Sequence, residues 1–247
     1  MRPPVDSIIA PPFPAGLDWV NVAMLRIDQQ LGRPVLIEFW DFCRPSSLRT
    51  LPYVKAWHER YSPAGLRVIG VHTPGFAPAR DNTAAREAVA RLGIEHAVLL
   101  DPDMQVWNLY ENAGWPARYL FDQELRLVDF HYGEGAYAET ERAIQELLGD
   151  DREPVAPVHP EDDPDALIAV PTPDQPGAYS GPYEAGTVWA ILEGHGEIVV
   201  NGSPVAVDHP GAHPIVEHGR HTAGVLDLSI GDGVTCHAVC FSPGLAA

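Results

Sequence analysis

The stretch Cys43-Arg44-Pro45-Ser46 is the most chemically distinctive part of this chain of 247 residues. It lies between an apolar, β-branched run at 35–39 and a stretch at 46–61 whose apolar residues recur with a helical period. A cysteine at a helix N-terminus feels the helix dipole and unpaired backbone N–H groups, which lower its pKa and favour the thiolate. Arg44 would add to this effect, so Cys43 is a candidate nucleophile toward a disulfide or a peroxide.

No second thiol accompanies Cys43 in this stretch, because Ser46 stands three residues later. Such a cysteine could attack a substrate, but no neighbouring thiol in the motif could release it. It would need an outside thiol, as a one-cysteine peroxidase does. The expected partner is therefore a thiol- or disulfide-bearing protein or small molecule, and we expect no cofactor. The competing interpretation is that Cys43 is a buried, inert thiol.

Four further side chains are candidates for a substrate-binding groove. Trp40, Phe42 and Trp115 could form an apolar groove suited to an extended peptide or a thiol substrate. His72 follows a predicted strand, at the edge where the loops of an open α/β sheet converge on a ligand. Each also has a purely structural interpretation, the aromatic residues as core or rim and His72 as a histidine bonded to backbone.

The C-terminal part is rich in potential metal ligands, namely His195, His209, His213, His218, His221, His237, Cys236 and Cys240. On a strand, Cys236 and Cys240 would share a face but lie about 13 Å apart, at 3.3 Å per residue. Neither a disulfide nor a single zinc ion can join them without a bend. We therefore predict no metal site and expect the strand at 234–241 to present both cysteines to a hydrophobic core.

The first half of the chain alternates predicted strands and helices. Strands are expected at 35–39, 66–71, 97–100, 118–121 and 125–128, and helices at 46–61, 82–92, 102–111 and 137–148. Pro52 should kink the first helix, and Asp101-Pro102 should open the third as a cap followed by proline. The two last strands form a hairpin. This order predicts an α/β fold with a mixed sheet and helices on both faces.

The second half follows an acidic, proline-rich stretch and changes its pattern. Residues 150–182 read as an extended linker, which divides the chain into domains at 1–149 and 183–247. Strands are expected at 188–192, 197–200, 205–207, 214–217, 225–228 and 234–241. Asn201-Gly202 is a strong two-residue hairpin signal. Strands at this spacing predict a small all-β sandwich of the jelly-roll kind.

Several motifs of the first half together resemble the thioredoxin superfamily, in particular its TlpA-like and DipZ-like, or redoxin, branch. They are Phe39-Trp40, Arg49-Thr50-Leu51-Pro52-Tyr53, Val68-Ile69-Gly70-Val71-His72 and Gly114-Trp115-Pro116-Ala117-Arg118-Tyr119-Leu120. The resemblance covers roughly residues 12–148. It implies a thioredoxin fold, thiol-disulfide exchange and a cis-proline loop in which Pro116 shapes the substrate groove. In the DipZ-like branch a β-sandwich that looks like a carbohydrate-binding module follows, and the strand series here is similar in position.

The cysteines depart from the pattern of that family, and two registers are open. Counted without gaps, the family's first cysteine falls on Arg44 and its second on Ser47, while Cys43 takes the place of an aromatic residue. In the shifted register, Cys43 is the nucleophile and Ser46 replaces the resolving cysteine. The first predicts a site that is inactive as a dithiol, and the second a monothiol enzyme.

Two functions therefore remain. One is a redoxin-type oxidoreductase or one-cysteine peroxidase, with antioxidant activity, that uses Cys43, Arg44 and Ser46. The other is a catalytically inactive binding or scaffold protein whose β-sandwich recognises a ligand, such as a carbohydrate.

Charge and hydropathy exclude some partners. The net charge of −18 makes nucleic acid and anionic membranes poor partners. No apolar run approaches the ~20 residues of a membrane span, and the N-terminus lacks the apolar stretch of a signal peptide. We therefore expect a cytoplasmic protein, with a homodimer left open.

Overall fold

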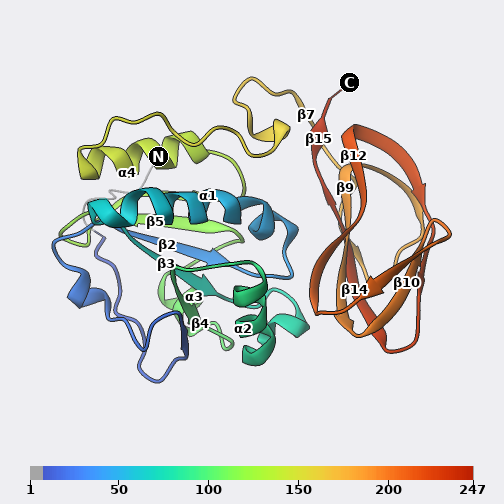
Figure 1. Cartoon of the computed structure of the whole chain (residues 1–247), viewed down its shortest axis with the longest axis horizontal. Coiled ribbons are helices and arrows are strands. Elements are labelled where there is room, and N and C mark those ends of the chain that lie inside the picture. The colour runs from blue at the N-terminus through green and yellow to red at the C-terminus, as the bar shows by residue number, and fades with distance from the viewer. Residues whose placement is uncertain (1–7, 247) are drawn as a thin grey trace. The chain divides into compact units, whose positions relative to one another are not determined.

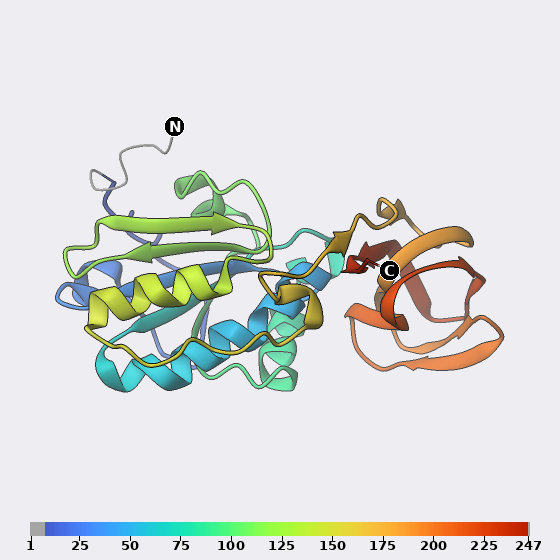
Figure 2. The same cartoon turned by 90° about the horizontal axis from the view of Figure 1, so that it is seen from above.

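The computed structural model describes residues 8–246, which form two compact units. The first unit comprises the chain up to Ala156 except for Phe42–Pro45, and the second comprises Phe42–Pro45 and the chain from Pro157 onward. Figures 1 and 2 draw the first unit in blue to yellow-green and the second, apart from the blue Phe42–Pro45, in yellow to red.

The first unit is built on one six-stranded sheet with the order β1-β4-β3-β2-β5-β6. Its strands are β1 (Trp19–Val20), β2 (Val35–Trp40), β3 (Arg67–His72), β4 (Ala97–Leu100), β5 (Ala117–Phe121) and β6 (Leu127–Tyr132). β2, β3 and β4 are parallel, whereas β1, β5 and β6 pair antiparallel with their neighbours. The predicted mixed sheet is confirmed.

In the described part of the chain, four α-helices accompany this sheet: α1 (Pro45–Tyr61), α2 (Asn82–Arg91), α3 (Gln105–Leu109) and α4 (Tyr137–Leu148). Short 3-10 turns add Ile27–Gln30, Ser62–Ala64 and Ala77–Arg80. α1 and α4 cover one face and α3 lies against the other (Figure 1). α1 continues through Pro52, which lies inside it.

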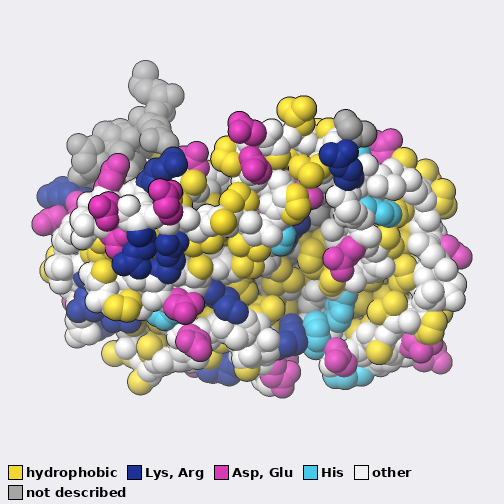
Figure 3. Space-filling model, turned by 45° about the horizontal axis from the view of Figure 1, so that its top comes forward, with side chains coloured by type: hydrophobic (Ala, Val, Ile, Leu, Met, Phe, Trp, Pro, Cys, Tyr) yellow, Lys and Arg dark blue, Asp and Glu magenta, His cyan; other side chains and the backbone are white. Residues whose placement is uncertain are grey.

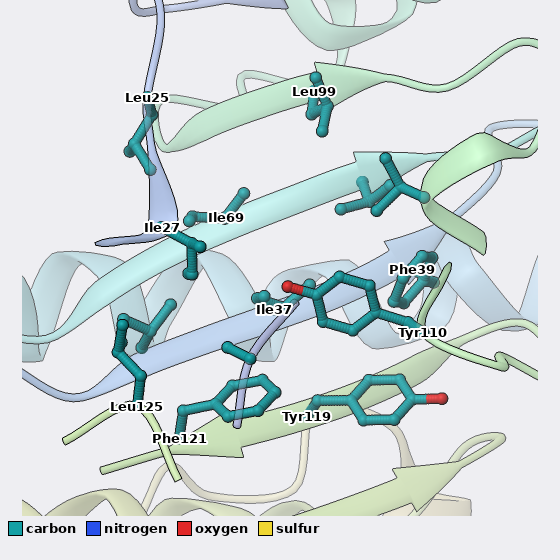
Figure 4. Close-up of a cluster of buried hydrophobic side chains, with 14 of the residues drawn as sticks. Leu25, Ile27, Ile37, Phe39, Ile69, Leu99, Tyr110, Tyr119, Phe121 and Leu125 are labelled. Carbon is teal, nitrogen blue, oxygen red and sulfur yellow. The ribbon is translucent and has the colours of Figure 1, made fainter. Parts of the chain in front are cut away.

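The alternation of side chains along β2 explains why this strand holds the two layers together. Val35, Ile37 and Phe39 face the cluster that Figure 4 shows, together with residues of α3 and β5. Leu36 faces the opposite cluster, which α1 and α4 close. All six residues of the strand are buried, as expected of a central strand with both faces covered.

The third helix is shorter than the predicted 102–111. Met104 has a left-handed backbone, with φ of 57°, so it cannot belong to a right-handed helix, and α3 begins only at Gln105. Asp101 still acts near the helix start, because the backbone N–H of Trp107 donates to its Oδ2 at 2.9 Å.

A buried carboxylate joins α4 to α1 and to the chain that follows α4. Glu141 is 1% exposed and accepts hydrogen bonds from Trp57 Nε1, Arg60 Nη1, Tyr61 Oη and the backbone N–H of Val155, at 2.6–3.0 Å. The chain up to Ala156 therefore packs on the first unit, and the predicted linker does not begin at residue 150.

The second unit is all β. Its four-stranded sheet has the order β12-β9-β14-β8 and its three-stranded sheet the order β11-β10-β13, while β15 pairs with β7. The strands are β7 (Ile168–Ala169), β8 (Gln175–Pro176), β9 (Gly181–Gly194), β10 (Gly196–Val200), β11 (Ser203–Val207), β12 (Gly211–Leu226), β13 (Leu228–Ile230), β14 (Val234–Ser242) and β15 (Gly244–Leu245). A 3-10 turn spans Pro160–Asp162. One hydrophobic cluster combines residues of the two larger sheets.

The predicted linker at 150–182 is thus largely part of this second unit. β7 and β8 both fall within it and pair with strands near the C-terminus. These pairings bridge residues far apart in the sequence, so a composition rich in proline and acid did not reveal them. The predicted hairpin at Asn201-Gly202 is present, joining β10 to β11 with φ of 51° and 80° at the two turn residues.

A β-bulge decides where the two C-terminal cysteines point. Cys236 lies opposite Leu192, whereas Cys240 lies opposite Trp189, because the register shifts between Cys236 and Ala238. Directly opposed residues share a face, and Leu192 but not Trp189 belongs to the core. The expectation that both cysteines face the core is therefore wrong for Cys240, since one extra residue reverses the alternation.

Acidic side chains are scattered among other types over the face drawn in Figure 3. Within residues 8–246, no helix is long and apolar enough to cross a lipid bilayer.

Candidate thiol site and the loops around it

The start of α1 sets the geometry of the motif. The helix begins at Pro45, so Arg44 is the residue directly before it and Cys43 lies one residue earlier, in the turn after β2. Proline suits this first helical position, because its missing N–H would have no partner there. Cys43 therefore does not occupy the helix N-terminal position that would lower the pKa of its thiol most.

Ser46 and Ser47 occupy the first helical turn in different surroundings. Ser47 is fully buried, and the backbone N–H of Asp41 donates to its Oγ at 3.2 Å. Ser46 is half-buried, and its Oγ donates to the carbonyl oxygen of Trp115 at 3.3 Å. The structure thus brings Ser46 to the Trp115–Pro116 loop, as expected of two loops that form one site.

All three cysteines of the chain are present as thiols rather than as disulfides. Cys43 is buried. Burial raises the pKa of Cys236 to about 11, and burial together with Asp174 raises that of Cys240 further. At neutral pH both C-terminal cysteines are protonated, so neither is an activated nucleophile.

The Trp115–Pro116 peptide bond is cis, as the family resemblance implies for this loop. The indole N–H of Trp115 donates to the carbonyl oxygen of Thr73 at 3.0 Å, which ties the loop to the end of β3. The ring of Trp115 also lies against Trp107 of α3, with centroids 4.1 Å apart. The sequence reasoning did not single out Trp107, although it lies in the predicted third helix.

The other three predicted groove residues are core residues in this structure. Trp40 and Phe42 are each 1% exposed, and His72 is 2% exposed. Burial lowers the pKa of His72 to about 3, so its imidazole is neutral at physiological pH. Its 3.9 Å distance from Asp41 Oδ1 is therefore not an ion pair there. Of the aromatic candidates, Trp115 alone is partly exposed.

Sequence reasoning also missed a buried acid in β2, the strand that leads to the motif. Glu38 of β2 is fully buried opposite Arg118 of β5, and burial raises the pKa of Glu38 to about 8, against the opposing effect of the guanidinium. Arg118 donates to the carbonyl oxygen of Gly135 and lies over the ring of Tyr137, 4.9 Å from its centroid. The signal was available, because Glu38 interrupts an otherwise apolar strand.

The C-terminal histidines form separate pairs. His237 Nε2 lies 2.8 Å from Glu193 Oε2, His221 lies 3.6 Å from Glu184, and His218 is hydrogen-bonded to Tyr183 Oη. Over the described part of the chain, no group of three or more potential ligands is close enough to hold one metal ion.

Comparisons with known proteins show what the first unit is similar to. No family model matches the chain. The DipZ protein of Mycobacterium tuberculosis is 34% identical over 144 residues, which is 57% of this chain and 21% of DipZ. The thiol-disulfide oxidoreductase YkuV of Bacillus subtilis is 27% identical over 133 residues, which is 53% of this chain and 88% of YkuV. The matched segment thus spans only about a fifth of DipZ.

Solved structures of thioredoxin-like proteins are similar to the same part of the chain. A thiol-disulfide isomerase from Corynebacterium glutamicum superposes with a TM-score of 0.51 at 20% identity, covering 57% of this chain and 98% of its own. The thioredoxin-like superfamily protein SPOA0173 gives a TM-score of 0.54 at 21% identity, covering 59% and 99%. The first unit of this chain has the thioredoxin-like redoxin fold of the DsbE- and TlpA-like thiol-disulfide oxidoreductases.

Proposed function

We propose that this chain is a thioredoxin-fold binding protein that does not perform dithiol–disulfide exchange. Its partner is a polypeptide, held as an extended segment against Trp107 and Trp115, next to the cis Trp115–Pro116 bond. The observation that carries this proposal is the start of α1: Arg44 precedes the first helical residue and Ser47 is the third. In the register without gaps, both cysteine positions of the family therefore hold residues without a thiol.

The chemistry of exchange explains why these two positions matter. A thiolate at the helix N-terminus attacks the substrate disulfide, and a second thiol then releases the mixed disulfide. The first 156 residues contain one cysteine, Cys43, which lies two residues before the helix and is buried. The attacking thiolate and the releasing thiol are therefore both missing from the positions that exchange requires.

The binding surface rests on a rigid aromatic pair. Trp107 and Trp115 are both partly exposed and lie against each other, and the hydrogen bond to Thr73 holds the Trp115 ring in place. Aromatic side chains that are already fixed give large apolar contact area at little cost in conformational entropy. Such a pair beside Pro116 suits an extended peptide.

Restoring cysteines tests the register and the loss of exchange together. The double variant Arg44→Cys/Ser47→Cys should form an intramolecular disulfide and gain turnover with a disulfide reductant, measured by insulin reduction. The single variant Ser46→Cys, which pairs a new thiol with Cys43, is the matched comparison and should gain nothing. Turnover by the Ser46→Cys variant, or by the unaltered protein, would contradict the proposal.

The binding half of the proposal has its own measurement. The insulin B chain with blocked cysteines is an extended peptide that cannot exchange disulfides. Its affinity for the full chain should fall about tenfold or more in Trp115→Ala, as expected for a central aromatic anchor. Val128→Ala, on the exposed part of β6, is the control and should bind like the unaltered protein. Equal affinity of all three proteins would rule out this surface.

A second function is favoured by one observation: Cys43 adjoins Arg44 at the start of α1. In that case Cys43 acts as a single thiolate on an external disulfide or peroxide and is released by an outside thiol. It predicts alkylation of native Cys43 with a midpoint well below the pH of about 8.5 that is typical of a free thiol. It also predicts that Cys43→Ser abolishes the reactivity. Slow labelling of Cys43 until the chain is unfolded would exclude it.

A further inference from the structure

A cavity of about 420 Å³ opens on the first unit between the β5–β6 hairpin, the end of α3 and the chain near residue 8. Five of its ten described lining residues are aromatic, namely Tyr110, Tyr119, Phe121, Phe130 and Tyr132. Figure 4 shows three of these side chains, Tyr110, Tyr119 and Phe121, next to one another. Pockets of this size and composition are typical of small-molecule sites. Trp107 and Trp115 do not line it.

A chain of hydrogen bonds sets the polarity of this cavity. The amide nitrogen of Asn112 donates to the carbonyl oxygen of Gly114 at 3.1 Å, which orients the amide so that its Oδ1 accepts. Tyr119 donates its hydroxyl proton to that Oδ1 at 2.9 Å. The hydroxyl groups of Tyr119 and Tyr132 are 2.9 Å apart, and the Tyr119 proton is already used, so Tyr132 must be the donor between them.

The direction of these hydrogen bonds leaves the Tyr132 hydroxyl oxygen as an acceptor. Its single proton is directed toward Tyr119, so its remaining capacity is its lone pairs. Tyr132 is also 41% exposed, so a ligand can reach it. A ligand that donates a hydrogen bond therefore fits this end of the cavity, and one that only accepts does not.

The charge of the lining residues also favours a ligand that donates hydrogen bonds. Among the described residues 8–246, Glu111 is the only acidic residue that lines the cavity, it is exposed at the rim, and no lysine, arginine or histidine lines the cavity. The aromatic faces also attract a cation through their negative quadrupole. A protonated amine can pair with the Glu111 carboxylate, contact the ring faces and donate a hydrogen bond to the Tyr132 hydroxyl at the same time.

We infer that this cavity binds a small planar aromatic molecule that carries a protonated amine. The ring lies among the aromatic walls, and the ammonium group donates to the Tyr132 hydroxyl near Glu111. This site is separate from the Trp107–Trp115 surface and does not depend on the function proposed there.

Three probes of matched size test the inference with the full chain. Phenethylammonium carries the ring and the charge, 2-phenylethanol is its neutral counterpart, and 3-phenylpropionate is an anion. Isothermal titration calorimetry should give saturable binding of phenethylammonium, about tenfold or more tighter than 2-phenylethanol, which one charge-assisted hydrogen bond supplies. The anion should bind weakest.

Point variants assign the preference to residues. Glu111→Gln and Tyr132→Phe should each weaken phenethylammonium several-fold and narrow its advantage over 2-phenylethanol, because each removes one of its polar partners. Val128→Ala lies on the same strand as Tyr132, does not line the cavity and should change nothing. Trp115→Ala should likewise leave binding intact, which separates this site from the proposed peptide surface.

Three results would overturn the inference. They are the absence of saturable binding of phenethylammonium, equal or tighter binding of 3-phenylpropionate, and unchanged affinity in both Glu111→Gln and Tyr132→Phe. Circular dichroism of each variant confirms that a loss of binding does not come from unfolding.

Discussion

Glu38 in β2 lies directly opposite Arg118 in β5, and both side chains are buried. Neither carboxylate oxygen of Glu38 has a hydrogen-bond partner within the described chain. Burial without hydrogen bonds disfavours the charged form, and this outweighs the attraction of the guanidinium in raising the pKa of Glu38 to about 8. At neutral pH the carboxyl group is therefore mostly protonated.

This raised pKa makes the stability of the first unit depend on pH. In the unfolded chain Glu38 ionises near pH 4.5, whereas in the folded protein it holds its proton up to about pH 8. The folded state binds more protons between these values, so stability falls as pH rises through this window, by up to ~1.4 kcal/mol per pH unit. Glu38→Gln should remove this slope and be increasingly more stable than the unaltered protein as pH approaches 8.

Urea unfolding at pH 5.5 and pH 8, followed by tryptophan fluorescence, measures the effect. Five of the six tryptophans, all but Trp189, lie in the first unit, so the signal reports mainly on it. Glu146→Gln, on the exposed side of α4, is the control and should leave the slope unchanged. Parallel pH profiles for the unaltered protein and Glu38→Gln would show that Glu38 is ionised in the folded state.

Glu141 should be among the costliest residues to truncate. Its carboxylate accepts from the side chains of Trp57 and Tyr61, which are buried, so Glu141→Ala would leave the Trp57 indole N–H and the Tyr61 hydroxyl proton without an acceptor. The expected loss is about 3 kcal/mol or more of unfolding free energy. Glu146→Ala, five residues further along α4 and exposed, should change stability by less than about 0.5 kcal/mol. Urea unfolding of the two variants side by side decides the matter, and similar stabilities would contradict this assignment.

Gly70 in β3 leaves room for two large neighbours. A Cβ at this position would lie 3.0 Å from Trp40 Nε1 and 3.2 Å from His96 Nε2. Both rings are buried and cannot move away easily, so Gly70→Ala should cost about 1–3 kcal/mol. At Gly114 a Cβ would meet nothing within 4 Å, so Gly114→Ala is the control. A neutral Gly70→Ala would mean that these rings repack.

The C-terminal cysteines should react slowly with alkylating agents. Burial raises the pKa of both thiols, that of Cys236 to about 11, so less than a hundredth of Cys236 is thiolate at pH 8. Iodoacetamide labelling at pH 8, located by mass spectrometry, should be slow at both sites in native protein and fast in urea. Rapid native labelling of Cys240 would show that this thiol is accessible and more acidic than its burial implies.

Local sequence signals were sufficient for most elements of the fold. The apolar run before the motif, the helical period after it and the Asn201-Gly202 turn each predicted an element that is present, because hydrophobic period and turn chemistry act over a few residues. The third helix was overestimated, since nothing local announced the left-handed backbone at Met104.

Some features of the candidate site likewise follow from the sequence, whereas others depend on the folded structure. The amino-acid sequence by itself determined that no second thiol follows Cys43 in the motif, and the family resemblance implied that Pro116 belongs to the loop beside it. It left two registers open, because both fit the spacing. The position at which α1 begins depends on packing of the whole helix, and it puts Arg44 rather than Cys43 directly before the first turn.

Tertiary structure alone decided which distant residues meet and which face a side chain takes. Glu38 and Arg118 lie 80 residues apart in sequence, and they become neighbours only because β5 pairs with β2. One extra residue at the bulge in β14 turns Cys240 away from the core that Cys236 faces. Strand pairing and bulges are non-local, since their energy comes from partners elsewhere in the chain, so hydrophobic period along one strand cannot reveal them.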